Sequence, residues 1–104
     1  MISMAQILIV DDHPEDVEWI SDMVPDHAVV LCSTVDEAWS KISSGEKIDL
    51  LIIDIMMPRG KLFARDDFSD KKTGEYFYQE AKKVLPEVKC FFLSMLGRKL
   101  EDPA

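Results

Sequence analysis

The chain has 104 residues, with 20 Asp and Glu against 12 Lys and Arg, so its formal net charge is −8. This length predicts a single domain, residues 1–104, and a hydrophobic content of 47% is enough to build a core. The acidic balance argues against direct binding of nucleic acid, which needs clustered Lys and Arg. No apolar run approaches the roughly 18–20 residues of a membrane span, and the first residues do not resemble a signal peptide.

The first half of the chain alternates between predicted strands and helices. Ile7–Val10 is a continuous apolar run rich in β-branched residues, typical of a buried strand, and the Asp-Asp-His-Pro segment after it predicts a turn into a helix. Ala28–Cys32 is a second apolar strand. Thr34 and Glu37 then fit a capping box, which predicts the start of a second helix. Each predicted helix carries apolar residues at helical spacing: Val17, Ile20 and Val24 in the first, and Val35, Ala38, Trp39 and Ile42 in the second.

The second half repeats this alternation around a long loop. Leu50–Ile53 is a third apolar strand, and it ends at Asp54. After the loop, residues 74–85 predict a helix with Phe77, Ala81, Val84 and Leu85 on one face, and residues 88–93 predict a fourth strand that leads to Ser94. Alternation of this kind with fully apolar strands predicts an α/β fold, with a parallel sheet covered by helices on both faces. Ligands of such sheets bind beyond the carboxyl ends of the strands.

Three acidic residues fall at predicted carboxyl ends of strands. Asp11 and Asp12 follow the first strand, and Asp54 ends the third. If these strands are neighbours, the three carboxylates converge, and their mutual repulsion requires a cation or bound protons. A hard divalent ion with oxygen ligands fits such a set, and Mg²⁺ is the usual one where phosphate chemistry follows. A hydroxyl at Ser94 would lie in the same crevice and could donate to a phosphoryl oxygen.

The two cysteines are not expected to bind a metal ion or to take part in a reaction. Cys32 and Cys90 both lie in apolar strand-like runs, which predicts buried, reduced thiols of a cytoplasmic protein. Two Cys and two His without close ligand spacing give no sign of a zinc site.

The combined pattern resembles the receiver domain of two-component response regulators, specifically the chemotaxis-type single-domain receivers. The matching segments are Ile7–Asp12, Leu50–Pro58, Gly74 and Phe91–Ser94, and the resemblance covers residues 5–96. It implies a flavodoxin-like, doubly wound parallel sheet that lacks the last helix-strand-helix of ordinary receivers.

The resemblance also implies a role for each site residue. Asp54 matches the phosphoacceptor, and Ser94 matches the hydroxyl residue that contacts the phosphoryl group. Asp11 and Asp12, with Asp54 and the backbone carbonyl of Met56, match the Mg²⁺ site. The implied reaction is transfer of a phosphoryl group from a histidine kinase or phosphotransfer protein to Asp54, followed by contact with a downstream protein target in bacterial signalling.

Two departures from the receiver pattern have consequences. The inserted loop 59–73 carries five bases and three acids on an acidic protein, and it is either a solvated insertion or a partner-docking segment. The sequence stops before the fifth strand, which supplies a Lys in ordinary receivers. Lys99 follows Ser94 too closely to take that place. The fourth strand is therefore expected to be an exposed edge, which favours a homo-oligomer, cover by the tail, or a partner protein.

The leading hypothesis is a Mg²⁺-dependent phosphoacceptor that is not an enzyme beyond self-catalysed aspartyl phosphorylation and dephosphorylation. The alternative is a degenerate receiver that acts as a protein-interaction module without phosphorylation. A Mg²⁺-dependent phosphohydrolase of small molecules would use the same acids, but the sequence shows no general acid beside the nucleophile.

Overall fold

The structure, a computed structural model, describes residues 5–58, 60–63 and 72–93. In these residues four strands form one parallel sheet in the order β2-β1-β3-β4. The strands are β1 (Gln6–Val10), β2 (Ala28–Cys32), β3 (Leu50–Asp54) and β4 (Lys89–Leu93). The predicted parallel sheet is confirmed, and β1 and β3 are neighbours at its centre.

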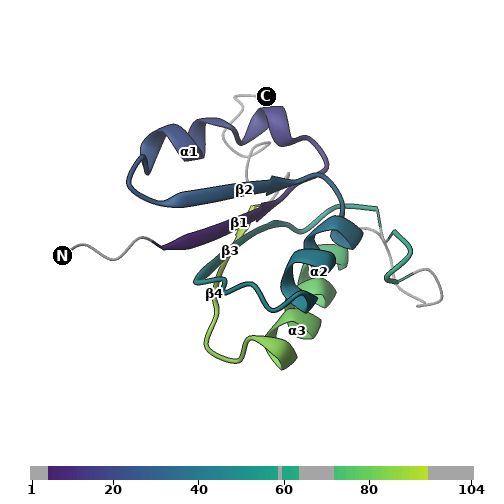
Figure 1. Cartoon of the computed structure of the whole chain (residues 1–104). Helices are drawn as coiled ribbons and strands as arrows, with labels where there is room; N and C mark the ends of the chain where they lie inside the picture. Colours follow the sequence, from purple (N-terminus) through teal and green to yellow (C-terminus); the bar gives the residue numbers. More distant parts are fainter. Residues whose placement is uncertain (1–4, 59, 64–71, 94–104) are drawn as a thin grey trace, which may run out of the picture.

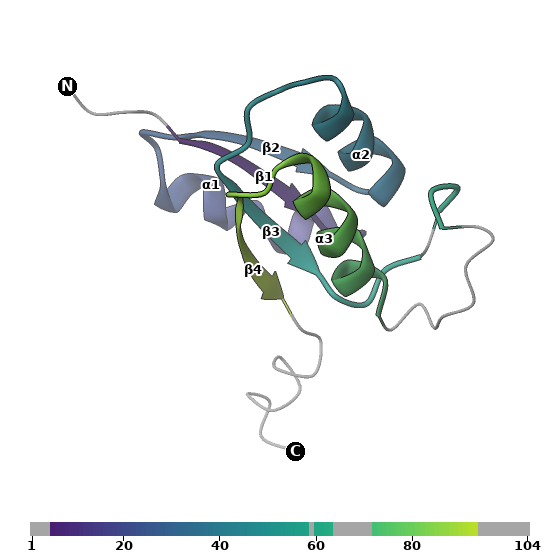
Figure 2. The ribbon, with the colours of Figure 1, turned by 90° about the horizontal axis from the view of Figure 1, so that it is seen from below.

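Helices cover both faces of this sheet (Figure 1). A short 3-10 turn, η1 (Pro14–Asp16), and α1 (Trp19–Met23) lie on one face. On the other face α2 (Val35–Ser43) and α3 (Thr73–Val84) lie side by side (Figure 2). The arrangement is the doubly wound α/β fold that the sequence predicted. None of the helices in the described ranges is long and apolar enough to cross a bilayer.

The hydrophobic core has one cluster on each face of the sheet. The larger cluster joins β1 and β3 to α2 and α3, and it includes Leu8, Val10, Leu51, Ile53, Ile42 and Phe77. The smaller cluster lies under α1 and joins Ile7, Ile9, Val17 and Ile52. Alternate residues of each central strand therefore point into opposite clusters, so both strands are buried on both faces. This burial explains why their sequences are continuously apolar.

The first helix differs from the prediction of one continuous helix ending before Pro25. The chain forms η1, leaves helical geometry at Val17 and then forms α1, which has only five residues. Neither His13 nor Glu18 provides a side-chain cap for these two segments. Val17 is buried against the sheet, so tertiary packing at this residue takes precedence over helix continuity.

The second helix begins as the capping-box pattern predicted. The Thr34 hydroxyl accepts a hydrogen bond from the Glu37 N–H at 3.1 Å, and the Glu37 carboxylate accepts one from the Ser33 N–H at 2.9 Å. The third helix buries Phe77 and Ala81 as predicted, but Val84 is 47% exposed. Val84 is the last residue of α3, where the chain leaves the helix for the turn that precedes β4.

The fourth strand forms an edge of the sheet within the described residues. There, β4 pairs with β3 alone, and Phe91 and Phe92 are 65% and 40% exposed. Phe92 makes an edge-to-face contact with Tyr78 of α3, with ring centroids 5.6 Å apart. The expected exposed edge is confirmed for the part of the chain that the structure describes.

The two cysteines are free, as predicted. Cys32 is buried, whereas Cys90 on β4 is only half-buried, so the prediction that both thiols are buried is wrong for Cys90. Burial raises the pKa of the Cys32 thiol to about 12 and that of Cys90 to about 11.

Candidate functional site

The carboxyl ends of β1 and β3 bring two buried acids together. Val10 and Ile53 are paired in the parallel register, and Asp11 and Asp54 are the next residues of their chains. Each is only 1% exposed. The Asp11 N–H donates to the Cys32 carbonyl of β2, and the Ile55 N–H donates to the Leu93 carbonyl of β4, both at 3.0 Å. Neighbouring strands therefore fix the backbone on either side of the site.

The Asp54 carboxyl group is held by its own loop and lies in an acidic environment. Its Oδ1 accepts a hydrogen bond from the Met56 N–H at 3.1 Å. Burial raises its pKa to about 6, and the charges of Asp11 and Asp12 and a hydrogen-bond interaction with Asp12 act in the same direction, while the Met56 N–H opposes the shift. Asp54 therefore combines a fixed orientation with strong negative charge around it, which is the setting that attracts a cation.

Asp12 and His13 form the solvent side of the site. Asp11 Oδ1 accepts a hydrogen bond from the His13 N–H at 2.8 Å, and this contact turns the chain after β1. The His13 Nδ1 then lies 3.2 Å from Asp12 Oδ1. One ligand atom from each of Asp11, Asp12 and His13 lies within 4.8 Å of the others. Sequence reasoning treated His13 only as part of a turn, and its position directly after two acids was the available signal.

The donor set fits a hard divalent cation. Carboxylates of Asp11, Asp12 and Asp54 come from two adjacent loops, and oxygen ligands of this kind suit Mg²⁺. Met56, the fourth predicted contributor, is tied to the site by its N–H, and metal binding by its carbonyl stays a prediction. Ser94 and Lys99 lie outside the described residues, so the predicted phosphoryl contact of Ser94 stays a prediction too.

The loop after β3 is closed at its root, next to Asp54. The Gly74 N–H donates to the Ile55 carbonyl at 2.9 Å. A Cβ atom at Gly74 would lie 2.3 Å from the Asp54 carbonyl oxygen and 2.7 Å from the Ile55 Cα, which are both backbone atoms. The start of α3 therefore packs directly on the residue that bears the candidate nucleophile, and only glycine fits there.

The beginning of the inserted loop is attached to α2. Both Asp36 carboxylate oxygens accept backbone hydrogen bonds, from Lys61 at 2.8 Å and from Leu62 at 2.7 Å. We name this contact the Asp36 clasp. Gly60 precedes it with φ +63, and Phe63 follows it, 5% exposed, in the larger core cluster. Residues 60–63 are thus packed on the domain, and 64–71 lie outside the described residues.

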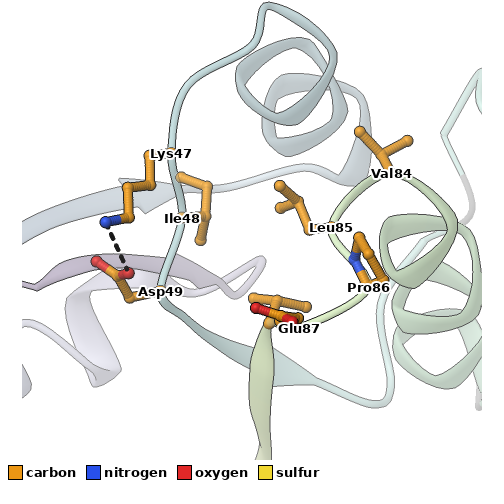
Figure 3. A pocket seen from close by; sticks show the side chains of 8 residues that line it. Lys47, Ile48, Asp49, Val84, Leu85, Pro86 and Glu87 are labelled. Carbon is orange, nitrogen blue, oxygen red and sulfur yellow. Dashed lines mark ion pairs between the residues drawn. The ribbon is translucent and has the colours of Figure 1, made fainter.

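A surface pocket lies at the amino ends of the strands, at the other end of the sheet from Asp54 (Figure 3). Its volume is about 450 Å³, and it lies between the turn before β3 and the turn before β4, at the amino ends of both strands. Lys47 and Asp49 form an ion pair of 3.9 Å on one wall, while Val84 and Pro86 line the other. Because the strands run parallel, this pocket is separated from Asp54 by the length of β3.

Similarity to known proteins is found in the comparison with solved structures and not in the comparisons of sequence. No protein-family model and no curated protein sequence matches the chain. A CheY-like receiver domain protein from Methanospirillum hungatei JF-1 is similar in structure, with a TM-score of 0.68, 24% identity, and coverage of 88% of this chain and 65% of that one. A receiver domain protein from Clostridium thermocellum has a TM-score of 0.66 and 22% identity over 93% and 76% of the two chains.

A third similar structure is the BeF3-activated receiver domain of DrrB from Thermotoga maritima. Its TM-score is 0.66, with 20% identity over 89% of this chain and 68% of that domain. The chain therefore has the flavodoxin-like fold of response-regulator receiver domains, as its sequence motifs predicted. It spans only 65% of the Methanospirillum hungatei protein and 68% of the DrrB receiver domain.

Proposed function

We propose that this chain is a phosphoacceptor receiver of a two-component system, located in the cytoplasm, in which Asp54 accepts a phosphoryl group. The observation that carries the proposal is the position of Asp11 and Asp54, which directly follow the paired residues Val10 and Ile53 of adjacent parallel strands and are both buried. The charge of Asp12 also acts on Asp54. Two buried carboxylates at the edge of a core are costly without a function, because each must be desolvated beside a like charge.

The proposed donor is a phosphohistidine of a histidine kinase or phosphotransfer protein. The Asp54 carboxylate oxygen attacks phosphorus in line, a P–O bond forms, and the P–N bond to the donor imidazole breaks. The Met56 N–H orients the Asp54 carboxylate for this attack. Mg²⁺, bound by Asp11, Asp12, Asp54 and the Met56 carbonyl, would neutralise charge on the transferring oxygens, and Ser94 would contact the phosphoryl group.

The product is an acyl phosphate, which adds charge to the loops after β1 and β3 and is read by a downstream protein. The chain itself is proposed to be a signalling module rather than an enzyme. We assign the charged segment 59–73 to partner docking, because its first described residues pack on α2 and because Phe63 shares the larger core cluster with Ile53 and Met57, which flank Asp54 in the sequence.

The proposal is tested by intact-mass measurement after treatment with acetyl phosphate and Mg²⁺. Wild type should gain one phosphoryl group, and Asp54→Asn should not. The matched control is Asp49→Asn, at the amino end of the same strand, which should be phosphorylated like wild type. Absence of a mass gain in wild type with any small phosphodonor would refute the proposal.

A second candidate is favoured by the exposed aromatic residues of β4, which offer a contact surface that does not depend on Asp54. On this alternative the chain is a degenerate, non-phosphorylated protein-interaction module. Partner binding would then be the same for wild type and Asp54→Asn, with or without a phosphodonor.

A further inference from the structure

One side of β4 is occupied by its pairing with β3. The Lys89 N–H donates to the Asp49 carbonyl at 3.3 Å, and the Leu93 carbonyl accepts from the Ile55 N–H at 3.0 Å. The N–H and C=O groups of a strand change side from one residue to the next, so Phe91, midway between Lys89 and Leu93, also turns its groups toward β3. The first, third and last residues of β4 therefore face its neighbour in the sheet.

The other side of β4 carries the backbone groups of Cys90 and Phe92. Because these residues alternate with the three that face β3, their N–H and C=O groups point away from it. In the ranges that the structure describes, β3 is the one strand that pairs with β4. Open groups on a strand edge bond to water or to a strand of another chain. This edge is thus spaced to receive one more strand.

Exposed aromatic side chains flank this edge on both faces of the sheet. Phe91 lies on the α1 face and is 65% exposed. Phe92 lies on the α3 face, 40% exposed, in edge-to-face contact with Tyr78. The strand contains one charged residue, Lys89, and no acid, although the whole chain has a net charge of −8. It is therefore a place where a second copy of this acidic chain meets no acid on the strand that it joins.

We propose that two copies of the chain join through β4 in antiparallel orientation, with Phe91 opposite Phe91 of the partner subunit. Cys90 then lies opposite Phe92 of the partner subunit, and each such pair exchanges both of its N–H···O=C hydrogen bonds. All the outward backbone groups of Cys90 and Phe92 are used in this register. The contact is the same surface on both copies, so it closes as a two-fold dimer.

The side chains of β4 match one another in this register. The two Phe91 side chains form a non-hydrogen-bonded pair, the kind in which side chains approach most closely. On the other face Phe92 meets the partner's Cys90. Lys89 lies opposite the partner's Leu93, so no like charges are opposed. A register that places Cys90 opposite itself would instead leave the outward groups of Phe92 without a partner inside β4.

The inference goes beyond the proposed function and does not depend on it. The strands of the two copies run in opposite directions, so the two Asp54 residues lie toward opposite ends of the joined sheet. Pairing through β4 therefore needs no phosphoryl group and no metal ion. Asp54→Asn should form the dimer as wild type does, which separates this proposal from the proposed function.

Cross-linking tests the register. Lys89→Cys and Leu93→Cys are made separately in full chains that also carry Cys90→Ser, and each is treated with diamide, alone and as a mixture. Opposed residues of a non-hydrogen-bonded pair have Cα atoms about 4.5 Å apart, within the range of a disulfide. Identical positions of the two copies are four residues apart along the strand, about 14 Å, and cannot be bridged. Cys32 stays in place, because it is buried and burial raises the pKa of its thiol to about 12.

We expect the mixture to form the disulfide-linked dimer about tenfold faster or more than either variant alone. Another register or a parallel arrangement would not oppose residues 89 and 93. A mixture that cross-links no faster than the separate variants would therefore overturn the proposal.

Sedimentation without oxidant or phosphodonor tests the edge itself. Wild type should form a dimer, and Cys90→Pro should raise the dimer dissociation constant about tenfold or more, because proline removes an outward N–H and no bond to β3. Cys90→Ser keeps the N–H and is the matched control, expected within about threefold of wild type. A monomeric wild type, or a dimer that Cys90→Pro leaves unchanged, would overturn the proposal. Circular dichroism checks that Cys90→Pro is folded, and the cross-linking result decides if it is not.

Discussion

At the residue scale, the buried carboxyl group of Asp54 lowers the stability of the folded domain when it is ionised. Its carboxyl group has a pKa of about 6 instead of 3.8, chiefly because it is buried, so the folded state binds a proton more tightly than the unfolded state. For such a group, stability is greatest below the unfolded pKa and falls as the pH rises through the folded pKa. Without metal, ionised Asp54 therefore destabilises the domain at neutral pH.

We predict that Asp54→Asn stabilises the metal-free protein by about 1–3 kcal/mol at pH 7.5, since each unit of pKa shift corresponds to about 1.4 kcal/mol. The gain should shrink at pH 4.5, where the wild-type carboxyl group is protonated in the folded state. Urea unfolding in the presence of a chelator measures both values. Asp22→Asn, which changes an exposed acid of α1, is the control, and an equal effect of Asp54→Asn at the two pH values would contradict the predicted role of burial.

Gly74 must be glycine because it packs against the backbone of β3 and the residue that follows it. An added Cβ would overlap backbone atoms of Asp54 and Ile55, which cannot move without separating α3 from β3. We predict that Gly74→Ala destabilises the domain by about 1–3 kcal/mol or more. It should also slow phosphorylation, because the backbone that carries the nucleophile must shift.

Gly45 provides the matched control for this substitution. It also requires glycine, but for its φ of +90, and a Cβ there meets no atom within 4 Å. Gly45→Ala should therefore cost only about 1 kcal/mol, from backbone strain, and leave phosphorylation unchanged. Thermal unfolding and the phosphorylation rate together distinguish the two glycines, and equal effects of both substitutions on the rate would count against a special role for Gly74.

At the scale of elements, the Asp36 clasp joins α2 to the loop that follows β3. Asp36→Asn keeps one acceptor oxygen and loses the charge, and Gly60→Ala places a Cβ 2.6 Å from Asp36 Oδ2 at a φ that disfavours alanine. We predict that each substitution costs about 1–2 kcal/mol. Because both break the same contact, the double variant should cost less than the sum, with a coupling of about 0.5–1 kcal/mol.

Glu37→Gln is the control for the clasp. Glu37 is the next acid of the same first turn, so its neutralisation has a similar effect on the helix dipole. Its carboxylate accepts a hydrogen bond from the Ser33 N–H, whereas the described loop residues 60–63 bond to Asp36. The losses of unfolding free energy caused by Glu37→Gln and by Gly60→Ala should therefore be additive in the double variant. Additive costs for Asp36→Asn and Gly60→Ala in urea unfolding would show that the clasp is not a single interaction.

At the scale of the whole molecule, the exposed aromatic residues of β4 are the part of the described surface most prone to association. Phe91 lies on the α1 face of the sheet, paired with Ile52, at a position that α1 does not cover. Exposed apolar side chains on an edge strand favour contact with another strand. We predict that Phe91→Thr lowers concentration-dependent self-association and dye binding.

Sedimentation over a range of concentrations measures this effect. Met23→Thr is the control, because Met23 is 70% exposed but belongs to the helix α1 and not to a strand, and it should leave the association constant unchanged. A wild-type protein that stays monomeric and binds no hydrophobic dye would contradict the prediction.

The sequence predicts those helices and strands whose apolar pattern indicates burial. It does not predict features that depend on contacts between elements. The three carboxylates at the strand ends were predictable, because a buried charge that closes an apolar run is costly and is rarely retained without a functional role. The break at Val17, the exposure of Val84 and the Asp36 clasp were not predictable, because each depends on where one element ends relative to another. The contact between the His13 ring and Asp12 was not predictable either, because the sequence does not show the orientation of an exposed side chain.

The hydrogen bond between Ile55 and Gly74 has a consequence for protein engineering. The two ends of the loop meet at this point regardless of what lies between them, and Phe63 is already anchored in the core. Doubling the length of a flexible loop costs only about 0.6 kcal/mol once its ends are fixed. A reporter peptide grafted into the chain beyond Phe63 should therefore leave the domain folded, while placing the reporter close to the aspartate whose modification it would detect.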